Sequence, residues 1–287
     1  MLLKTNRGEA MNDRIITIYC ICDDFLKSQG TTEYWHNVKI TDAELMTAFI
    51  LAHTDFYGNL DKARNFLREY GYIPSMLSKS RFCRRLHALD DSIWQKLITY
   101  AASKGAIFGL PNEFIVDSFP MRVCQNIRMH RSRLFHEKNY IGYNACRKEY
   151  FRGLKVHALV TTHGRPWIVW MTPGNVHDNR AYKERAPWMQ LREGSKTYGD
   201  NAYEDEALEN LLELRGQRLI ADRKENTTRP LHVRDFLDLR GVRKVVETTF
   251  SRIAALMPRR VHAVTEKGFI LKTFGFVTAV AFIFAIC

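Results

Sequence analysis

The second part of the sequence alternates short apolar runs with amphipathic helical stretches, and this alternation restricts the fold more than any other feature. Phe114-Ile115-Val116 is an apolar run typical of a buried strand. Residues 154–162 and 166–171 flank a four-residue connection containing Gly164, which predicts a β-hairpin. The elements that follow alternate in type: a helix at 178–191, a strand at 196–199, a helix at 205–214, a strand at 218–221 and a helix at 242–257. We therefore expect a mixed sheet flanked by helices.

That order of elements is typical of an α/β domain of the RNase H-like kind. The first part of the chain reads as all-helical. Thr41 and Glu44 form a capping-box pattern before a helix, and further helices are predicted at 61–70, from Ser78 or Ser80, and at 92–102. We expect an N-terminal helical region over residues 1–108 and an α/β domain with a C-terminal helix over residues 109–287.

The net charge is concentrated in the second region. The chain carries 43 basic and 31 acidic side chains, a net charge of +12. Residues 1–108 hold 14 basic and 12 acidic side chains, and residues 109–287 hold 29 and 19. Such an excess favours a polyanionic partner, either nucleic acid or an anionic membrane surface.

The apolar C-terminus argues for a buried helix rather than a membrane span. Lys272 interrupts the apolar stretch 268–287 and leaves fifteen uncharged residues, fewer than the roughly twenty that a bilayer requires. No signal-peptide pattern opens the sequence, and the six cysteines form no pair of Cys-x-x-Cys motifs. We expect no membrane association, and reduced thiols in the cytoplasm of a bacterium, with the protein on the nucleoid when DNA is bound.

Three carboxylates occupy positions where they can converge. Asp117 and Asp200 each follow a predicted strand, and Glu247 lies on the late helix. Carboxylate oxygens are the ligands that Mg²⁺ and Mn²⁺ prefer, and two such ions suit displacement at phosphorus. Asp222 and Glu225 are alternative third acids, and a strand-end turn acid is the commoner role for any one of these residues.

The late helix also places cations beside Glu247. Arg240 and Arg243 share its helical stripe at spacings of seven and four residues. Guanidinium groups there can hold a phosphate backbone beside the acids. An exposed Arg–Glu pair without further function is the alternative explanation.

Several motifs together resemble a known family. They are Ile-Val-Asp-Ser-Phe-Pro (115–120), Tyr-Phe-Arg-Gly-Leu-Lys-Val-His (150–157), Thr-Pro-Gly-Asn-Val-His-Asp (172–178), Tyr-Gly-Asp-Asn-Ala-Tyr (198–203) and Arg-Lys-Val-Val-Glu-Thr-Thr-Phe (243–250). In this order they resemble DDE transposases of bacterial insertion sequences, most closely the insertion-sequence 982 family. The resemblance covers roughly residues 35 to 275.

The resemblance implies an RNase H-like catalytic domain that binds two divalent metal ions, Mg²⁺ or Mn²⁺, through Asp117, Asp200 and Glu247. It also implies cleavage and joining of DNA strands at terminal inverted repeats. Arg243 and Glu247 match the family's Arg-x-x-x-Glu pattern. Two departures concern contacts with DNA ends: Arg240 stands in place of the family's tyrosine and Ala254 in place of its lysine, for which Arg252 is a substitute on another helical face.

A basic insertion at 121–153 is a second candidate DNA contact. Residues 121–155 carry nine basic and two acidic side chains with aromatic residues between them, a mixture that suits an opened DNA end. A helix with basic residues in the first region could read the terminal repeat. The cations that we expect to contact DNA are Arg81, Arg84, Arg85, Arg128, Arg131, Arg133, Lys155, Arg240, Arg243, Lys244 and Arg252. His177 and Asp178 are candidates to orient the metal ligands, although Asp178 could equally cap the next helix.

The sequence thus predicts an enzyme that cleaves and joins double-stranded DNA, in which residues 1–108 bind and synapse DNA and residues 109–287 catalyse. We expect a homodimer because two element ends must be joined. An RNase H-like nuclease without strand transfer, or a catalytically silent DNA-binding relic, are the alternatives. The terminal-repeat sequence, the target preference and the choice between Met1 and Met11 as the start stay open.

Overall fold

The computed structural model describes residues 2–30, 38–104, 109–124, 126–144, 147–225, 227 and 229–286, without the side chains of 2–9 and 126–128. The chain forms two compact units. One comprises Met1–Gly105 together with Ile253–Cys287, and the other comprises Ala106–Arg252.

The first unit is helical, as the sequence predicts. Its helices are α1 (Leu2–Ser28), α2 (Asp42–Asp55), α3 (Leu60–Glu69), α4 (Lys79–Ala88), α5 (Asp91–Lys104) and α9 (Glu266–Ile286). The predicted capping box is present: the Thr41 hydroxyl accepts from the Glu44 amide at 3.1 Å, and the Glu44 carboxylate accepts from the Thr41 amide at 2.6 Å. Helix α2 can therefore begin at Asp42 and carry an almost fully buried face.

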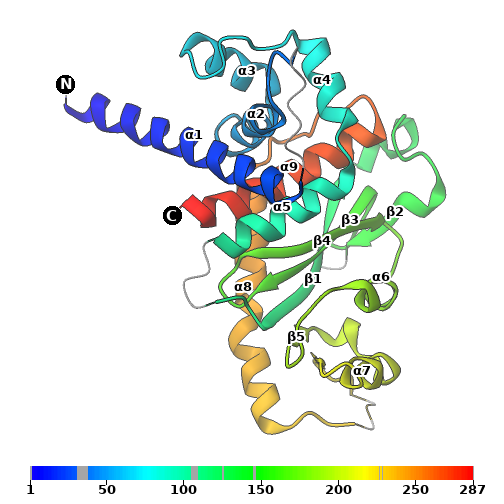
Figure 1. Cartoon of the computed structure of the whole chain (residues 1–287). Helices are drawn as coiled ribbons and strands as arrows, with labels where there is room; N and C mark the ends of the chain where they lie inside the picture. The colour runs from blue at the N-terminus through cyan, green and yellow to red at the C-terminus, as the bar shows by residue number, and fades with distance from the viewer. Residues whose placement is uncertain are drawn as a thin grey trace. The chain divides into compact units, whose positions relative to one another are not determined.

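The C-terminal helix belongs to this helical unit, which corrects its predicted place in the α/β domain. Helix α9 is apolar around most of its circumference, so it needs neighbours on several sides. It packs on α2 and α5 and buries aromatic residues such as Phe269, Phe276 and Phe282 (Figure 1). Among the described residues, α9 is the one helix that is long enough and apolar enough to cross a bilayer. In the structure, 61% of its most apolar window is buried.

The second unit is built on a six-stranded mixed sheet. Its strands are β1 (Glu113–Arg122), β2 (Ile141–Asn144), β3 (Glu149–Thr161), β4 (Pro166–Pro173), β5 (Lys196–Gly199) and β6 (Arg218–Ala221). Strand β1 is central: it pairs antiparallel with β3, which pairs with β4 and β2, and it pairs parallel with β5, which pairs parallel with β6. An antiparallel meander extended by two parallel strands is the RNase H-like arrangement, which confirms the predicted fold class.

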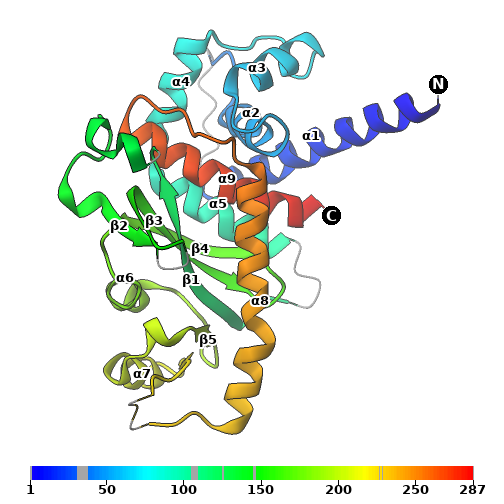
Figure 2. The same cartoon turned by 180° about the vertical axis from the view of Figure 1, so that it is seen from behind.

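Helices cover both faces of this sheet. Helices α6 (Asp178–Arg185) and α7 (Glu206–Glu213) lie on one side, and α8 (Val233–Leu256) lies on the other (Figures 1 and 2). Phe250 of α8 packs on Phe119 of β1 with ring centroids 4.8 Å apart, and the hydroxyl of Thr249 donates to the Gly164 carbonyl at 2.9 Å. The boundary between the two units falls within α8, after Arg252.

Some elements differ from the prediction. Helix α6 ends at Arg185, and a 3₁₀ turn at Ala186–Trp188 follows because Pro187 cannot continue an α-helix. Helix α8 begins nine residues earlier than expected, at Val233. Helix α1 and strand β2 had not been predicted.

Candidate active site

Three aspartates stand level on neighbouring parallel strands. Asp200 and Asp222 directly follow β5 and β6, whereas Asp117 lies within β1, which continues to Arg122, so the prediction that Asp117 follows its strand is wrong. In the parallel ladders, Ile115 of β1 is opposite Tyr198 of β5, and Gly199 of β5 is opposite Ala221 of β6. Asp117 lies two residues after Ile115. Asp200 lies one residue after Gly199, and Asp222 lies one residue after Ala221. The Asp222 amide donates to the Gly199 carbonyl at 3.0 Å, so the ladder continues to this level. The topology thus delivers three carboxylates to one place on the sheet.

Asp117 lies on the face of β1 that is turned towards α8. Residues two apart on a strand share a face, and Phe119 contacts α8. The pKa of Asp117 is raised from 3.8 to about 7, mainly by burial, with contributions from the nearby carboxylates of Asp200 and Asp178. The Ser118 amide donates to the Asp117 carboxylate at 2.7 Å and lowers the pKa, as does Arg243. The net result is a carboxylate whose charge is poorly compensated.

Asp200 occupies a matching position after β5. Its carboxylate accepts from the Ala202 amide at 2.9 Å and caps the 3₁₀ turn Asn201–Tyr203, which fixes the side chain at the strand end. Burial raises its pKa, with further contributions from Asp178 and Asp222, while Arg243 lowers it. Burial first, and neighbouring carboxylates second, thus disfavour the ionised form of both Asp117 and Asp200.

Arg243 brings α8 to these acids. Its guanidinium lies 3.9 Å from the Asp222 carboxylate, and it acts on the pKa of both Asp117 and Asp200. Glu247 follows one turn later and is exposed. Residues at spacings of four and seven share a helical face, so Glu247 lies on the stripe between Arg243 and Phe250, and both of these residues meet the sheet unit.

Asp178 joins a polar cluster beside the row of aspartates. It accepts from the Ser118 hydroxyl at 2.7 Å and lies 3.2 Å from Lys155 Nζ and 3.6 Å from His157 Nδ1. His157 Nε2 is 2.8 Å from the Thr172 hydroxyl. Burial lowers the pKa of His157 to about 4 against the opposing effect of Asp178, so the ring is neutral at pH 7. His177, by contrast, is exposed and makes no side-chain cap at the start of α6.

Tyr203 was missed by the sequence reasoning. Its side chain is 1% exposed, and its hydroxyl has no hydrogen-bond partner among the described residues. Burial raises its pKa well above the ordinary value, with additional effects of Asp178, Asp117 and Asp200. The signal that could have found it is its position three residues after Asp200, where a short turn returns the chain to the strand end.

The side chains on α8 that we predicted to contact DNA are exposed, and one of them also contacts an aromatic ring. Arg240, Arg243, Lys244 and Arg252 are all exposed. Arg240 also lies over the Phe236 ring at 4.7 Å from its centroid.

Those on α4 divide into two kinds. Arg81 and Arg84 are exposed, whereas Arg85 is half-buried and donates to the Ile40 carbonyl and the Asp42 carboxylate. Arg85 therefore joins α4 to the start of α2, so the expectation that it contacts DNA is not supported.

The basic insertion is partly structural. Arg152 is buried and donates to the carbonyls of Phe135 and Glu137, while Lys155 is half-buried and donates to the Val176 carbonyl at 2.9 Å. Arg131 and Arg133 are exposed, and the Arg128 side chain lies outside the described residues.

Two aromatic side chains of the insertion face solvent. Tyr143 on β2 and Tyr150 on β3 are directly opposite in the ladder, with ring centroids 5.1 Å apart, and they are 52% and 62% exposed. Phe135 and Phe151 are instead fully buried. The ribbon formed by β2 and the first part of β3 thus carries two exposed aromatic rings, and the exposed Arg131 and Arg133 precede it in the chain.

Among the described residues, no three His, Cys, Asp or Glu side chains converge closely enough to hold a metal ion. The donor set nevertheless fits a hard divalent cation. Asp117 and Asp200 offer carboxylate oxygens and lie in an environment that disfavours their own negative charge. A cation would relieve both the desolvation and the mutual repulsion.

The transposase DDE domain family matches residues 109–279. A search of curated protein sequences finds no match. Among solved structures, a piggyBac transposase synaptic complex with hairpin DNA is similar at 10% identity and a TM-score of 0.49, covering 94% of this chain and 72% of that one. A Mos1 transposase paired-end complex is similar at 12% identity and a TM-score of 0.25, covering 80% and 82%. With well over half of its length matched by the family, the chain belongs to the DDE-domain transposases.

Proposed function

We propose that this protein is an insertion-sequence transposase that cleaves DNA at the ends of its element and joins them to target DNA. Membership of the insertion-sequence 982 family, whose motifs this sequence resembles, is part of the proposal. The main support for the proposed activity is the row formed by Asp117, Asp200 and Asp222. These carboxylates lie side by side at the place on the sheet that Arg243 also reaches.

In this proposal Asp117, Asp200 and Glu247 hold two Mg²⁺ or Mn²⁺ ions. The ions would stabilise charge on the attacking and leaving oxygens of a displacement at phosphorus. Arg243 offsets the surplus charge of the aspartates and positions a phosphate. Asp178, held by Ser118 and Lys155, keeps the start of α6 beside the row and orients its neighbours.

The DNA is double-stranded and includes the terminal inverted repeats and the target. We assign backbone contacts to exposed Arg131 and Arg133 and base stacking to Tyr143 and Tyr150. Exposed Arg81 on α4 is a candidate to read the repeat. A homodimer in the bacterial cytoplasm completes the proposal, since two ends must be brought together.

The test uses purified protein, a supercoiled plasmid that carries the element's ends, and Mg²⁺. Asp200→Asn removes a charge from the row, and Asp205→Asn is the matched control. Asp205 caps α7 through the Leu208 amide and pairs with Lys183, outside the row. We expect cleaved and joined products with the wild type and with Asp205→Asn, and none with Asp200→Asn.

Other outcomes separate the alternatives. Metal-dependent nicking without joined product identifies a nuclease. DNA binding that survives Asp200→Asn without any metal-dependent chemistry identifies a silent DNA-binding protein and refutes the proposed enzyme. Chemistry that persists in Asp200→Asn refutes the assignment of the row.

A further inference from the structure

Tyr203 carries a buried hydroxyl beside the row of aspartates that has no hydrogen-bond partner. Its side chain is 1% exposed, and no atom of the described residues bonds to the hydroxyl. A buried hydroxyl without a partner destabilises the folded state, because it has lost its hydrogen bonds to water. Phenylalanine would fill the same space without this loss. An unpaired hydroxyl at such a place indicates a partner that is present only when a ligand is bound.

The ring of Tyr203 is held in place, so its hydroxyl has little freedom to reach solvent. The side chain packs directly on Gly199, where an added Cβ atom would come within 3.0 Å of the Tyr203 Cβ. The ring of Tyr182 meets it edge-on, with centroids 5.8 Å apart. The Tyr203 amide donates to the Asp200 carbonyl at 3.0 Å. The position of the hydroxyl is thus set by the end of β5.

Three carboxylates act on this hydroxyl. Asp178, Asp117 and Asp200 each add to the effect of burial, which raises the pKa of Tyr203 well above its ordinary value. A hydroxyl can pair with an ionised carboxylate only as a donor. None of the three accepts a hydrogen bond from Tyr203 in the metal-free protein. The hydroxyl is therefore a donor that stands near acceptors without being used.

Ser118 joins the two carboxylates that act most strongly on the Tyr203 hydroxyl. Its amide donates to Oδ1 of Asp117 and its hydroxyl donates to Oδ1 of Asp178, both at 2.7 Å. Lys155, at 3.2 Å, compensates the charge of Asp178. Among the described residues, Asp117 forms no ion pair, and its Oδ2 accepts no hydrogen bond. Asp117 is thus the carboxylate of this pair that still has room for a second donor.

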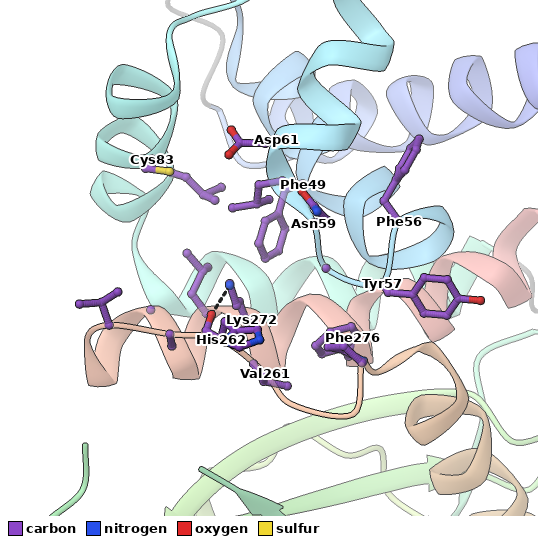
Figure 3. Close-up of a pocket in the computed structure, with 18 of the residues that line it drawn as sticks. Phe49, Phe56, Tyr57, Asn59, Asp61, Cys83, Val261, His262, Lys272 and Phe276 are labelled. Atoms are coloured by element: carbon purple, nitrogen blue, oxygen red, sulfur yellow. Dashed lines mark hydrogen bonds between the residues drawn. The ribbon is translucent and has the colours of Figure 1, made fainter. Parts of the chain in front are cut away.

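The cavity of the helical unit offers no such combination among its described lining residues. It has a volume of about 730 Å³ and is lined by parts of α3, α4 and α9 (Figure 3). Its single carboxylate, Asp61, is already paired with Lys79 and, at 2.7 Å, with Arg64. A cation would find no uncompensated acid there, in contrast to the row.

We propose that Tyr203 is a positioning residue of the cation site, whose hydroxyl donates to the Asp117 carboxylate when a divalent cation is bound at the row. The inference deepens the proposed function and rests on it for the presence of the cation. Carboxylates that bind metal ions are held by further hydrogen bonds of this kind, and losing one weakens metal affinity roughly 10- to 100-fold. Tyr203 acts through Asp117 and does not itself touch the cation.

The test measures Mn²⁺ binding in the absence of DNA, so catalysis does not enter the readout. Electron paramagnetic resonance quantifies free Mn²⁺ during a titration and gives the Kd and the number of bound ions. Asp117→Asn shows which binding belongs to the row, because it removes the charge of the proposed ligand. We expect Tyr203→Phe to raise the Kd of that binding by about 10-fold. The same variant should be at least as stable as the wild type without metal, since it lacks the unpaired hydroxyl.

Tyr182→Phe is the matched control. It is the same change in a neighbouring buried tyrosine, whose hydroxyl bonds to Thr197 rather than to an acid of the row. We expect its Kd for Mn²⁺ to equal that of the wild type. A second readout is the near-ultraviolet difference spectrum on addition of Mg²⁺, because a phenol that begins to donate a hydrogen bond absorbs at longer wavelength. A red-shifted tyrosine band should arise in the wild type and in Tyr182→Phe, and not in Tyr203→Phe.

Each outcome decides. Weaker Mn²⁺ binding and a missing band in Tyr203→Phe alone support the assignment. An unchanged Kd in Tyr203→Phe overturns it, as does a band that persists in that variant. Equal weakening in Tyr182→Phe, or a loss of metal-free stability in Tyr203→Phe, shows that the tyrosine serves packing and also overturns it. If no Mn²⁺ binding depends on Asp117, both this inference and the proposed metal site fail, whereas a failed plasmid reaction with intact Mn²⁺ binding refutes the proposed enzyme alone.

Discussion

Asp117→Asn should stabilise the metal-free protein at alkaline pH. Burial is the main cause that raises the pKa of Asp117 from 3.8 to about 7, so the native state binds its proton more tightly than the unfolded chain does. Stability therefore falls as pH rises through the window between these two values. Asparagine carries no charge and keeps an oxygen that can accept from the Ser118 amide.

The magnitude follows from the size of this window. At 1.36 kcal/mol for each pH unit, a rise from 3.8 to about 7 corresponds to about 4 kcal/mol in the free energy of unfolding. We expect Asp117→Asn to exceed the wild type by up to this amount at pH 8 and to equal it at pH 3.5. Millimolar Mg²⁺ should stabilise the wild type and not the variant, because the cation compensates the ionised carboxylate.

The assay is urea denaturation in EDTA at both pH values, followed by circular dichroism. Asp205→Asn is a control for which we expect the opposite change in stability. The pKa of Asp205 is lowered by Lys183 and by backbone hydrogen bonds in spite of burial. That variant should lose stability at pH 8. If Asp117→Asn were no more stable than the wild type at pH 8 without metal, the electrostatic description of the row would be refuted.

Three further changes test other parts of the structure. Thr249→Val removes a buried hydroxyl whose single proton lies between the Gly164 and Val245 carbonyls, and should cost about 1–3 kcal/mol in urea denaturation. Thr248→Val at an exposed position should cost much less, and equal losses would contradict this. Tyr203→Phe removes a buried hydroxyl that has no partner among the described residues, so it should raise metal-free stability by about 1 kcal/mol or more, and a loss would show that the hydroxyl is already bonded. Burial lowers the pKa of His53 from 6.5 to about 4, so the unfolded chain binds the extra proton and the wild type should lose stability between pH 6.5 and 4. His53→Leu should flatten that dependence in acid denaturation, and an unchanged slope would exclude His53 as its cause.

The sequence predicts those elements whose signals are local. The capping box at Thr41 and Glu44 fixes the start of α2, and the turn at Gly164 closes the β3–β4 hairpin; both are present. Helix α1 had a readable signal that was missed, because Ile15, Ile18, Cys22 and Phe25 recur at helical spacing and are buried.

Other features depend on contacts distant in sequence. The composition of α9 does not show which elements it packs against, because an apolar helix can be buried against any apolar surface of sufficient size. Asp222 lies beside Asp200 because of the register of β6 against β5. Strands of four residues do not determine their register by themselves. The internal use of Arg85 depends on its meeting α2, and nothing in α4 distinguishes it from Arg81.

The placement of α9 has a consequence for synthesis. The helix that fills the core beside α2 and α5 follows the whole of Ala106–Arg252 in the chain, so it is synthesised after the sheet unit. Until then Phe49, Trp94 and their neighbours lack the wall on which they pack, while the sheet unit already has every strand that it needs. Helices α2 and α5 are thus synthesised before the sheet unit but complete their packing after it, and a nascent chain acquires its row of aspartates before it completes its helical unit.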